Sequence, residues 1–289
     1  MGGDGVDRAE ELRSLLGGLD RVVVAFSGGI DSSLLLHAAT EALGAGRVMA
    51  VTTESPAVPP HEIDQARRLA DLIGVTHRVI PSGELSRDEY VANDGDRCYH
   101  CRIEMYTLIG AIARSGFEGT VIDGSNADDE GDYRPGMRAA AELGVRSPFR
   151  ELRITKGEIR SMARAAGLPN WNKPAQPCLA SRIPAGSPVT EAKLVQIDRA
   201  EQAIRALGID VVRVRHHGDV GRVEVGIEQL SRVVATPLRE KLVEALKSAG
   251  FRFVAIDLDG YRSGSVNPVT ARRSERPDHG QNQAFSEQT

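Results

Sequence analysis

Apolar residues in the first half of the chain come in short unbroken runs separated by amphipathic segments. The runs lie at 21–26, 48–53, 78–80 and 120–123, and they fit strands that are buried on both faces. Between them, Pro60 to Ile73 places its apolar residues on one helical face, and further helices are expected over 33–39 and near 105–114. Strands that alternate with helices predict an α/β fold with a doubly wound parallel sheet.

The pattern changes after residues 184–188, which are rich in Pro, Gly and Ser and predict an interdomain hinge. Thr190 is expected to cap a helix that runs to about Leu207. Two alternating segments around a Gly-Asp turn then predict a β-hairpin. We therefore expect an α/β domain over 1–184, an α+β domain for substrate binding and oligomerisation over 185–265, and a disordered tail over 266–289.

Composition narrows the class of protein. The 289 residues are 41% hydrophobic and 26% charged, which is typical of a globular protein, and the net charge of -4 does not favour a nucleic-acid partner. No apolar run is long enough to cross a bilayer, and no secretory signal is expected from the Gly-rich, charged start. Three cysteines are an odd number at low density, so no disulfide framework is expected. We expect reduced thiols in the cytoplasm.

The turn Ser27-Gly28-Gly29-Ile30-Asp31-Ser32 follows the first strand and precedes a helix. Such a turn binds anions, because glycines let backbone N–H groups converge at the positive end of the helix. It lacks the lysine and the glycine spacing of a Walker phosphate loop. It resembles the PP-loop of the ATP pyrophosphatases, such as NAD synthetase, GMP synthetase and the tRNA thiolases. The alternative is a plain helix cap.

A second polar loop, 123–129, follows another buried strand and is expected at the same sheet edge. Asp128 or Asp129 is a candidate ligand for Mg²⁺. A solvated acidic turn is the alternative for either residue.

The cysteines are Cys98 and Cys101, which form a C-x-x-C pair, and Cys178. By itself the pair fits a redox couple, half of a zinc site or half of an iron–sulfur site. Three thiolates can hold a cubane cluster with one iron left open, or zinc with His100 or water. Three unrelated thiols are the remaining alternative. Arg182 is expected to pair with an anion or to lower the pKa of Cys178.

Several stretches, taken together, resemble the LarE-type sulfur transferases, which act on pyridinium-3,5-biscarboxylic acid mononucleotide in nickel-pincer cofactor synthesis. The matching stretches are 27–32, 98–102, 123–129, 134–136, 147–148 and 178–182. The resemblance implies a PP-loop, adenine nucleotide alpha hydrolase-like domain that uses ATP and Mg²⁺. It implies that Cys178 handles the sulfur and, with Cys98 and Cys101, holds a [4Fe-4S] cluster charged by a sulfide donor. Some members instead sacrifice the sulfur of a single cysteine.

The predicted site residues follow from these motifs and the resemblance. The candidate catalytic residues are Asp31, Cys178, Ser181 and Arg182. The candidate nucleotide-binding residues are Ala25, Ser27, Gly28, Gly29, Asp31, Ser32, Gly124, Asn126 and Asp128. The candidate residues for binding the phosphate of the mononucleotide substrate are Arg182, Arg213 and Arg215. The alternative for Arg213 and Arg215 is that they lie on a solvated strand face. For a divalent metal in the second domain they are Glu201 and Glu224, and the expected assembly is a homo-oligomer.

Three other functions stay open at this point. Amidation, as in NAD synthetase, would give the cysteines no task. Thiolation of a tRNA base would normally require a basic surface or a zinc ribbon. A nucleotide sensor that binds zinc or a cluster would bind ATP without releasing pyrophosphate.

Overall fold

The structure is a computed structural model that describes residues 4–129, 135–174 and 176–262. Arg134, which belongs to one of the matching stretches, and the tail over 266–289 lie outside these ranges. No helix in the described part of the chain has the length and apolar character needed to cross a membrane.

The elements of the first unit run from α1 to α8. The helices are α1 (Asp4–Gly17), α2 (Ile30–Leu43), α3 (Pro60–Ile73), α4 (Asp88–Ala92), α5 (Arg97–Ile112), α6 (Pro135–Glu142), α7 (Pro148–Glu151) and α8 (Lys156–Ala165). The strands are β1 (Val22–Ala25), β2 (Val48–Glu54), β3 (Thr76–Pro81) and β4 (Thr120–Ile122). The second unit contains α9 (Glu191–Ala206), β5 (Val212–His217), β6 (Val220–Val225), α10 (Leu230–Val234), α11 (Leu238–Ser248) and β7 (Phe253–Ile256).

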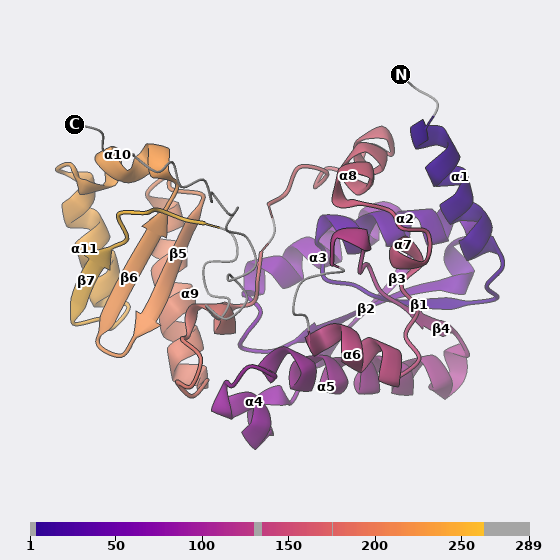
Figure 1. Cartoon of the computed structure of the whole chain (residues 1–289), viewed down its shortest axis with the longest axis horizontal. Helices are drawn as coiled ribbons and strands as arrows, with labels where there is room; N and C mark the ends of the chain where they lie inside the picture. Colours follow the sequence, from indigo (N-terminus) through magenta and orange to yellow (C-terminus); the bar gives the residue numbers. More distant parts are fainter. Residues whose placement is uncertain (1–3, 130–134, 175, 263–289) are drawn as a thin grey trace, which may run out of the picture.

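The four strands of the first unit form one parallel sheet in the order β3-β2-β1-β4. Val22 and Val24 face a core built with α1, α2, α3 and α8, while Val23 faces a second core built with α5. Figure 1 shows these helices on the two sides of the sheet. The central strand is therefore buried on both faces, which confirms the predicted doubly wound α/β fold.

The topology of this sheet fixes where a ligand can bind. From β1 the chain moves outward through β2 to β3 and then returns to place β4 on the other side of β1. The loops after β1 and β4 consequently lie next to each other and leave the sheet in opposite directions. In open α/β sheets, ligands bind at such a switch point, at the carboxyl ends of the strands.

The second unit is a small sheet in the order β5-β6-β7, covered by α9 and α11. β5 and β6 form the expected antiparallel hairpin, and β7 pairs with β6 in parallel. The turn lies at Gly218 and Asp219, the predicted Gly-Asp turn, and β6 begins directly after it at Val220. Arg213 and Arg215 point to the same face of β5, opposite Glu224 and Arg222 respectively.

The segment between the units is held in place more firmly than a hinge. The side-chain amide of Asn93 donates hydrogen bonds to the carbonyls of Pro184, at 2.8 Å, and Ser187, at 2.9 Å. The backbone N–H of Gly186 donates to Asn93, and that of Val189 to Val91. A core with Tyr90 continues through this segment into the first half of α9, whose second half packs in the core of the second unit. The domain boundary at 184/185 stays a prediction.

We predict that Asn93→Ala lowers the free energy of unfolding by about 1–3 kcal/mol, because it leaves buried carbonyls without their donor. Chemical denaturation of the purified protein measures the change. Asn172, which is exposed, is the matched control, and its alanine variant should stay within about 0.5 kcal/mol of the wild type. Equal stability of the two variants would restore the interpretation of residues 184–188 as a free hinge.

Candidate active site

The loop after β1 depends on two close backbone contacts. Gly28 has a φ of +68°, and a Cβ at this position would lie 3.1 Å from the Cα of Ala66 in α3. Gly124, in the loop after β4, passes so close to α2 that a Cβ would lie 2.9 Å from the backbone nitrogen of Ser32. Only glycine fits at both positions without displacing the backbone. The two loops therefore form one surface at the switch point.

Hydroxyl and amide side chains hold the loop in shape. Ser32 Oγ accepts a hydrogen bond from the N–H of Ser27 at 3.2 Å and donates one to the carbonyl of Gly29 at 3.1 Å. Asn170 donates to the carbonyl of Gly28 at 3.1 Å. Gly29 is the N-cap of α2 and provides no side-chain cap, so the first N–H groups of this helix remain available to an anion. Ala25 ends β1 directly before this loop.

Asp31, in the first turn of α2, lies under the same surface. It accepts a hydrogen bond from the side chain of Asn126 at 3.3 Å. Burial raises the pKa of Asp31 above its ordinary value, Lys156 opposes this shift, and the carboxylate of Asp129 adds to it. Two carboxylates in a partly desolvated position are stabilised by a divalent cation.

Of the two candidate Mg²⁺ ligands, Asp129 fits this position better than Asp128. Asp128 is exposed and accepts a hydrogen bond at 2.8 Å from the backbone of Lys156, at the start of α8. Asp129 is 6% exposed and is the carboxylate that influences the pKa of Asp31. Asp128 thus supports the first turn of α8, whereas Asp129 faces the loop.

The three cysteines come together from two segments far apart in the sequence. Cys98 and Cys101 lie in the first turns of α5, which begins eight residues before the expected start near Met105, and Cys178 lies just before the 3₁₀ helix η5 (Leu179–Arg182). Burial raises the pKa of Cys101 to about 12, and the nearby Cys178 and Cys98 add to this shift. Cys101 and Cys178 also pack against the same apolar core.

Arg97 is the cation beside these thiols, and the sequence analysis did not identify it. Its guanidinium donates hydrogen bonds to the carbonyl of Ala180 at 2.9 Å and to the side chain of Asn93 at 2.5 Å. Burial lowers the pKa of Arg97, but Cys178 and Cys98 raise it, and the net shift is upward. The first turn of α5 is thus attached to the loop that carries Cys178.

Metal binding at these thiols stays a prediction. Within residues 4–129, 135–174 and 176–262, no three His, Cys, Asp or Glu side chains are grouped closely enough to hold a metal ion. The [4Fe-4S] cluster and the zinc alternative at Cys98, Cys101 and Cys178 are therefore both untested by this arrangement.

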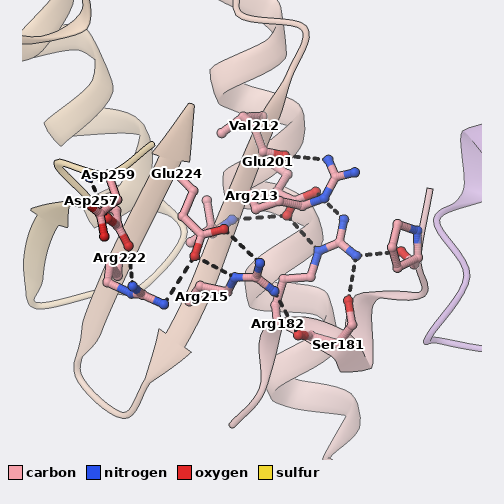
Figure 2. A network of polar contacts seen from close by, with 12 residues as sticks. Ser181, Arg182, Glu201, Val212, Arg213, Arg215, Arg222, Glu224, Asp257 and Asp259 are labelled. Atoms are coloured by element: carbon pink, nitrogen blue, oxygen red, sulfur yellow. Dashed lines mark hydrogen bonds and ion pairs between the residues drawn. The ribbon is translucent and has the colours of Figure 1, made fainter. Parts of the chain in front are cut away.

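Arg182 does not act on the Cys178 thiol in the way that the sequence suggested. It is 2% exposed and forms two hydrogen bonds with the carboxylate of Glu201 in α9, at 2.9 and 3.1 Å (Figure 2). Its remaining donor group binds the carbonyls of Pro177 and Cys178 and the hydroxyl of Ser181. Arg182 is therefore a positioning residue that holds the backbone of the cysteine loop against the second unit.

Glu201 and Glu224 do not have the surroundings of a divalent metal site. Glu201 accepts hydrogen bonds from Arg182, from Arg205 and from the backbone of Val214. Burial raises the pKa of Glu201, but Arg182, Arg205 and Arg213 lower it, and the net shift is downward. Glu224 accepts hydrogen bonds from Nε and Nη2 of Arg215, at 2.9 and 2.7 Å. These carboxylates hold arginines, and the expectation of metal ligands at Glu201 and Glu224 stays a prediction that these contacts do not support.

Arg213 and Arg215 lie on a buried face and not on a solvated one. They are 3% and 4% exposed. Arg215 also donates to the carbonyl of Ser181 at 2.9 Å, so both arginines lie close to the cysteine loop (Figure 2). The guanidinium of Arg213 lies 5.0 Å from the ring centre of Tyr261. Burial lowers the pKa of Arg213, and Arg182 lowers it further. Cations that repel each other in a buried position attract an anion.

Some known proteins are similar to this chain only in part, and others are similar over nearly its whole length. An NAD synthase family model matches residues 13–90, which contain the loop after β1. An NH(3)-dependent NAD(+) synthetase of Methanococcoides burtonii is 38% identical over 63 residues, 22% of this chain and 24% of that protein. The family match contains the loop after β1 and ends before Cys98.

Other relatives match nearly the whole chain. An uncharacterised protein of Synechocystis sp. is 42% identical over 265 residues, 92% of this chain and 98% of the relative. A Lactiplantibacillus plantarum protein named pyridinium-3,5-bisthiocarboxylic acid mononucleotide synthase is 38% identical over 254 residues, 88% of this chain and 91% of the relative. The chain belongs to the family of this synthase. The resemblance to the LarE family is thereby confirmed, and the iron–sulfur branch within it stays a prediction.

We predict that Asp31→Asn raises the melting temperature of the ligand-free protein at pH 7. A carboxylate whose pKa is raised in the folded state favours folding only while it stays protonated, so wild-type stability falls as the pH rises above the ordinary aspartate pKa of about 4. The asparagine keeps the oxygen that Asn126 binds. Asp128→Asn is the matched control and should give no gain, because burial does not raise the energy of this exposed carboxylate. Thermal unfolding between pH 4 and 8 tests both variants.

Proposed function

We propose that this protein is an ATP-dependent sulfur transferase that activates the carboxylates of pyridinium-3,5-biscarboxylic acid mononucleotide and converts them to thiocarboxylates, as a cytoplasmic step of nickel-pincer cofactor synthesis. Family membership over 88% of the chain, together with the Gly-rich loop at the switch point, is the observation that carries the proposal. Amidation is supported only by the similarity at 13–90. The expected homo-oligomer stays a prediction.

The first step joins the substrate carboxylate to AMP. A carboxylate oxygen attacks the α-phosphorus of ATP, the bond to the bridging oxygen breaks, and pyrophosphate leaves with the electron pair. The first N–H groups of α2, which no side chain caps, would stabilise this charge. Asp31 and Asp129 would hold Mg²⁺ against the phosphates, which relieves the repulsion that raises the pKa of Asp31.

In the second step a sulfur nucleophile attacks the activated carbonyl, and AMP leaves as a phosphate monoester anion. Cys178 would hold the sulfide-level donor beside the activated carbonyl and keep its own sulfur, because Arg182 and Arg97 hold the loop that carries Cys178 from both sides. The buried face that carries Arg213 and Arg215 adjoins the same loop, which supports our assignment of these arginines to the phosphate of the mononucleotide. Arg182 then positions the loop rather than contacting the substrate.

Cys98, Cys101 and Cys178 would hold a [4Fe-4S] cluster, which supplies an open iron that carries sulfide when the cluster is bound. The convergence of Cys101 from α5 and Cys178 from the segment before η5 on one apolar core supports this assignment.

The pyrophosphate step can be tested at Gly124. We predict that Gly124→Ala lowers the rate of pyrophosphate release from ATP and the mononucleotide by about 100-fold or more, because the new Cβ displaces the start of α2 from the phosphates. Gly46→Ala is the matched control, since its Cβ would meet no atom within 4 Å, and its rate should equal that of the wild type. If Gly124→Ala released pyrophosphate at the wild-type rate, the phosphates would have to bind elsewhere.

The sulfur step can be tested at the cysteines. We predict that replacing any one of Cys98, Cys101 and Cys178 with alanine removes bound iron and stops sulfur transfer together. In the wild type, reconstituted without oxygen and supplied with sulfide, each chain should form more than one product, and Cys178 should keep its sulfur in mass spectrometry. Stoichiometric dehydroalanine at Cys178 would replace the cluster mechanism with sacrifice of that cysteine and leave the family assignment unchanged.

A further inference from the structure

Two buried polar groups beside the cysteines have no partner. Tyr90, in α4, is 1% exposed, and Glu84, in the 3₁₀ helix η2 (Glu84–Ser86), is 2% exposed. Among the described residues, neither the hydroxyl of Tyr90 nor the Oε2 atom of Glu84 has a hydrogen-bond partner. Buried polar groups are nearly always paired, and an unpaired one destabilises the fold. One unpaired donor and one unpaired acceptor indicate a small ligand that can accept and donate.

Both groups lie at the cysteine site. Cys101 and Cys178 pack against the apolar core that contains Tyr90, and η2 packs against both α4 and α5. Burial raises the pKa of Tyr90, and the nearby Cys178, Cys101 and Glu84 add to the shift. Leu85, next to Glu84, packs against the same apolar core as Cys101 and Cys178. The phenol, the carboxylate and the two thiols therefore share one small region between α4, α5 and η5.

We propose that Tyr90 and Glu84 bind the incoming hydrosulfide beside Cys101 and Cys178, with the Tyr90 hydroxyl donating to the sulfur and the S–H donating to Glu84 Oε2. Hydrosulfide has one S–H donor and several lone pairs, which match the two unpaired groups. Leu179, Ala180 and Ile183 make the surroundings apolar, and Arg97, beside Tyr90 and Cys178, supplies the positive charge that a buried anion requires there. The proposal rests on the proposed function, because it names the residues that position the sulfur for transfer.

Water has the same pattern of donors and acceptors and is the competing occupant. The decisive measurement is the sulfide concentration that gives half-maximal thiocarboxylate formation in the reconstituted protein, with ATP and the mononucleotide saturating and sodium sulfide varied. We predict that Tyr90→Phe raises this concentration about tenfold or more, the effect of a lost hydrogen bond to a charged group. Pyrophosphate release should stay at the wild-type rate, because Tyr90 does not lie at the phosphate loop. An unchanged half-saturating concentration would overturn the proposal and leave water as the occupant.

Stability of the apoprotein provides a second readout that does not depend on turnover. Because the Tyr90 hydroxyl is unpaired, Tyr90→Phe should match or exceed the wild type in melting temperature. Tyr106 is the matched control: it is 2% exposed, but its hydroxyl donates to Asp123 and accepts from Arg102, so Tyr106→Phe should melt lower. A lower melting temperature for Tyr90→Phe would contradict the unpaired hydroxyl.

The two proposals fail in different ways. If the wild type formed no thiocarboxylate at any sulfide concentration, the proposed function would be wrong. If the wild type responded to sulfide and Tyr90→Phe responded identically, only the hydrosulfide site would be wrong.

Discussion

The buried pair of Arg182 and Glu201 connects the two halves of this molecule. Arg182 binds the carbonyls of the loop that carries Cys178, and Glu201 binds the backbone of β5. One ion pair therefore fixes this loop and β5 relative to each other. Two charges taken out of water lose hydration energy, and removal of one partner from such a pair typically costs about 3–5 kcal/mol. The pair therefore favours one arrangement of the units over others.

The loops after β1 and β4 contain features that lower the stability of the folded protein. Asp31 is ionised only against burial and against a second carboxylate, and the loop around it tolerates no side chain at Gly28 or Gly124. Such a site is poorly satisfied without ligand and gains most when a cation and phosphates enter. The same applies beside the cysteines, where the Tyr90 hydroxyl has no hydrogen-bond partner among the described residues.

A chain of polar contacts connects α5, which carries Cys98 and Cys101, to the loop after β4. Arg102, next to Cys101 in α5, donates to the hydroxyl of Tyr106, which donates to Asp123 at the end of β4. Asp123 directly precedes Gly124, which contacts the start of α2. These contacts attach α5 to the loop after β4 and, through Gly124, to the start of α2. The cysteine pair and the phosphate loop are thereby held in a fixed relative position.

The sequence by itself determined the parallel sheet, the hairpin and the phosphate loop, because each depends on local periodicity or on a short turn. It also placed the three cysteines and Arg182 among the important residues. It did not reveal Arg97, Tyr90, Glu84 or Asn170, because single residues with ordinary neighbours give no local signal. The start of α5 was missed because residues 97–104 are mostly polar and show no apolar periodicity.

Only the tertiary structure decided which charges meet. Arg182 looked like a cation for the thiol and Glu201 like a metal ligand, and folding pairs the two with each other. Pairing between side chains distant in the sequence depends on how the units pack, and desolvation then makes the pairing obligatory.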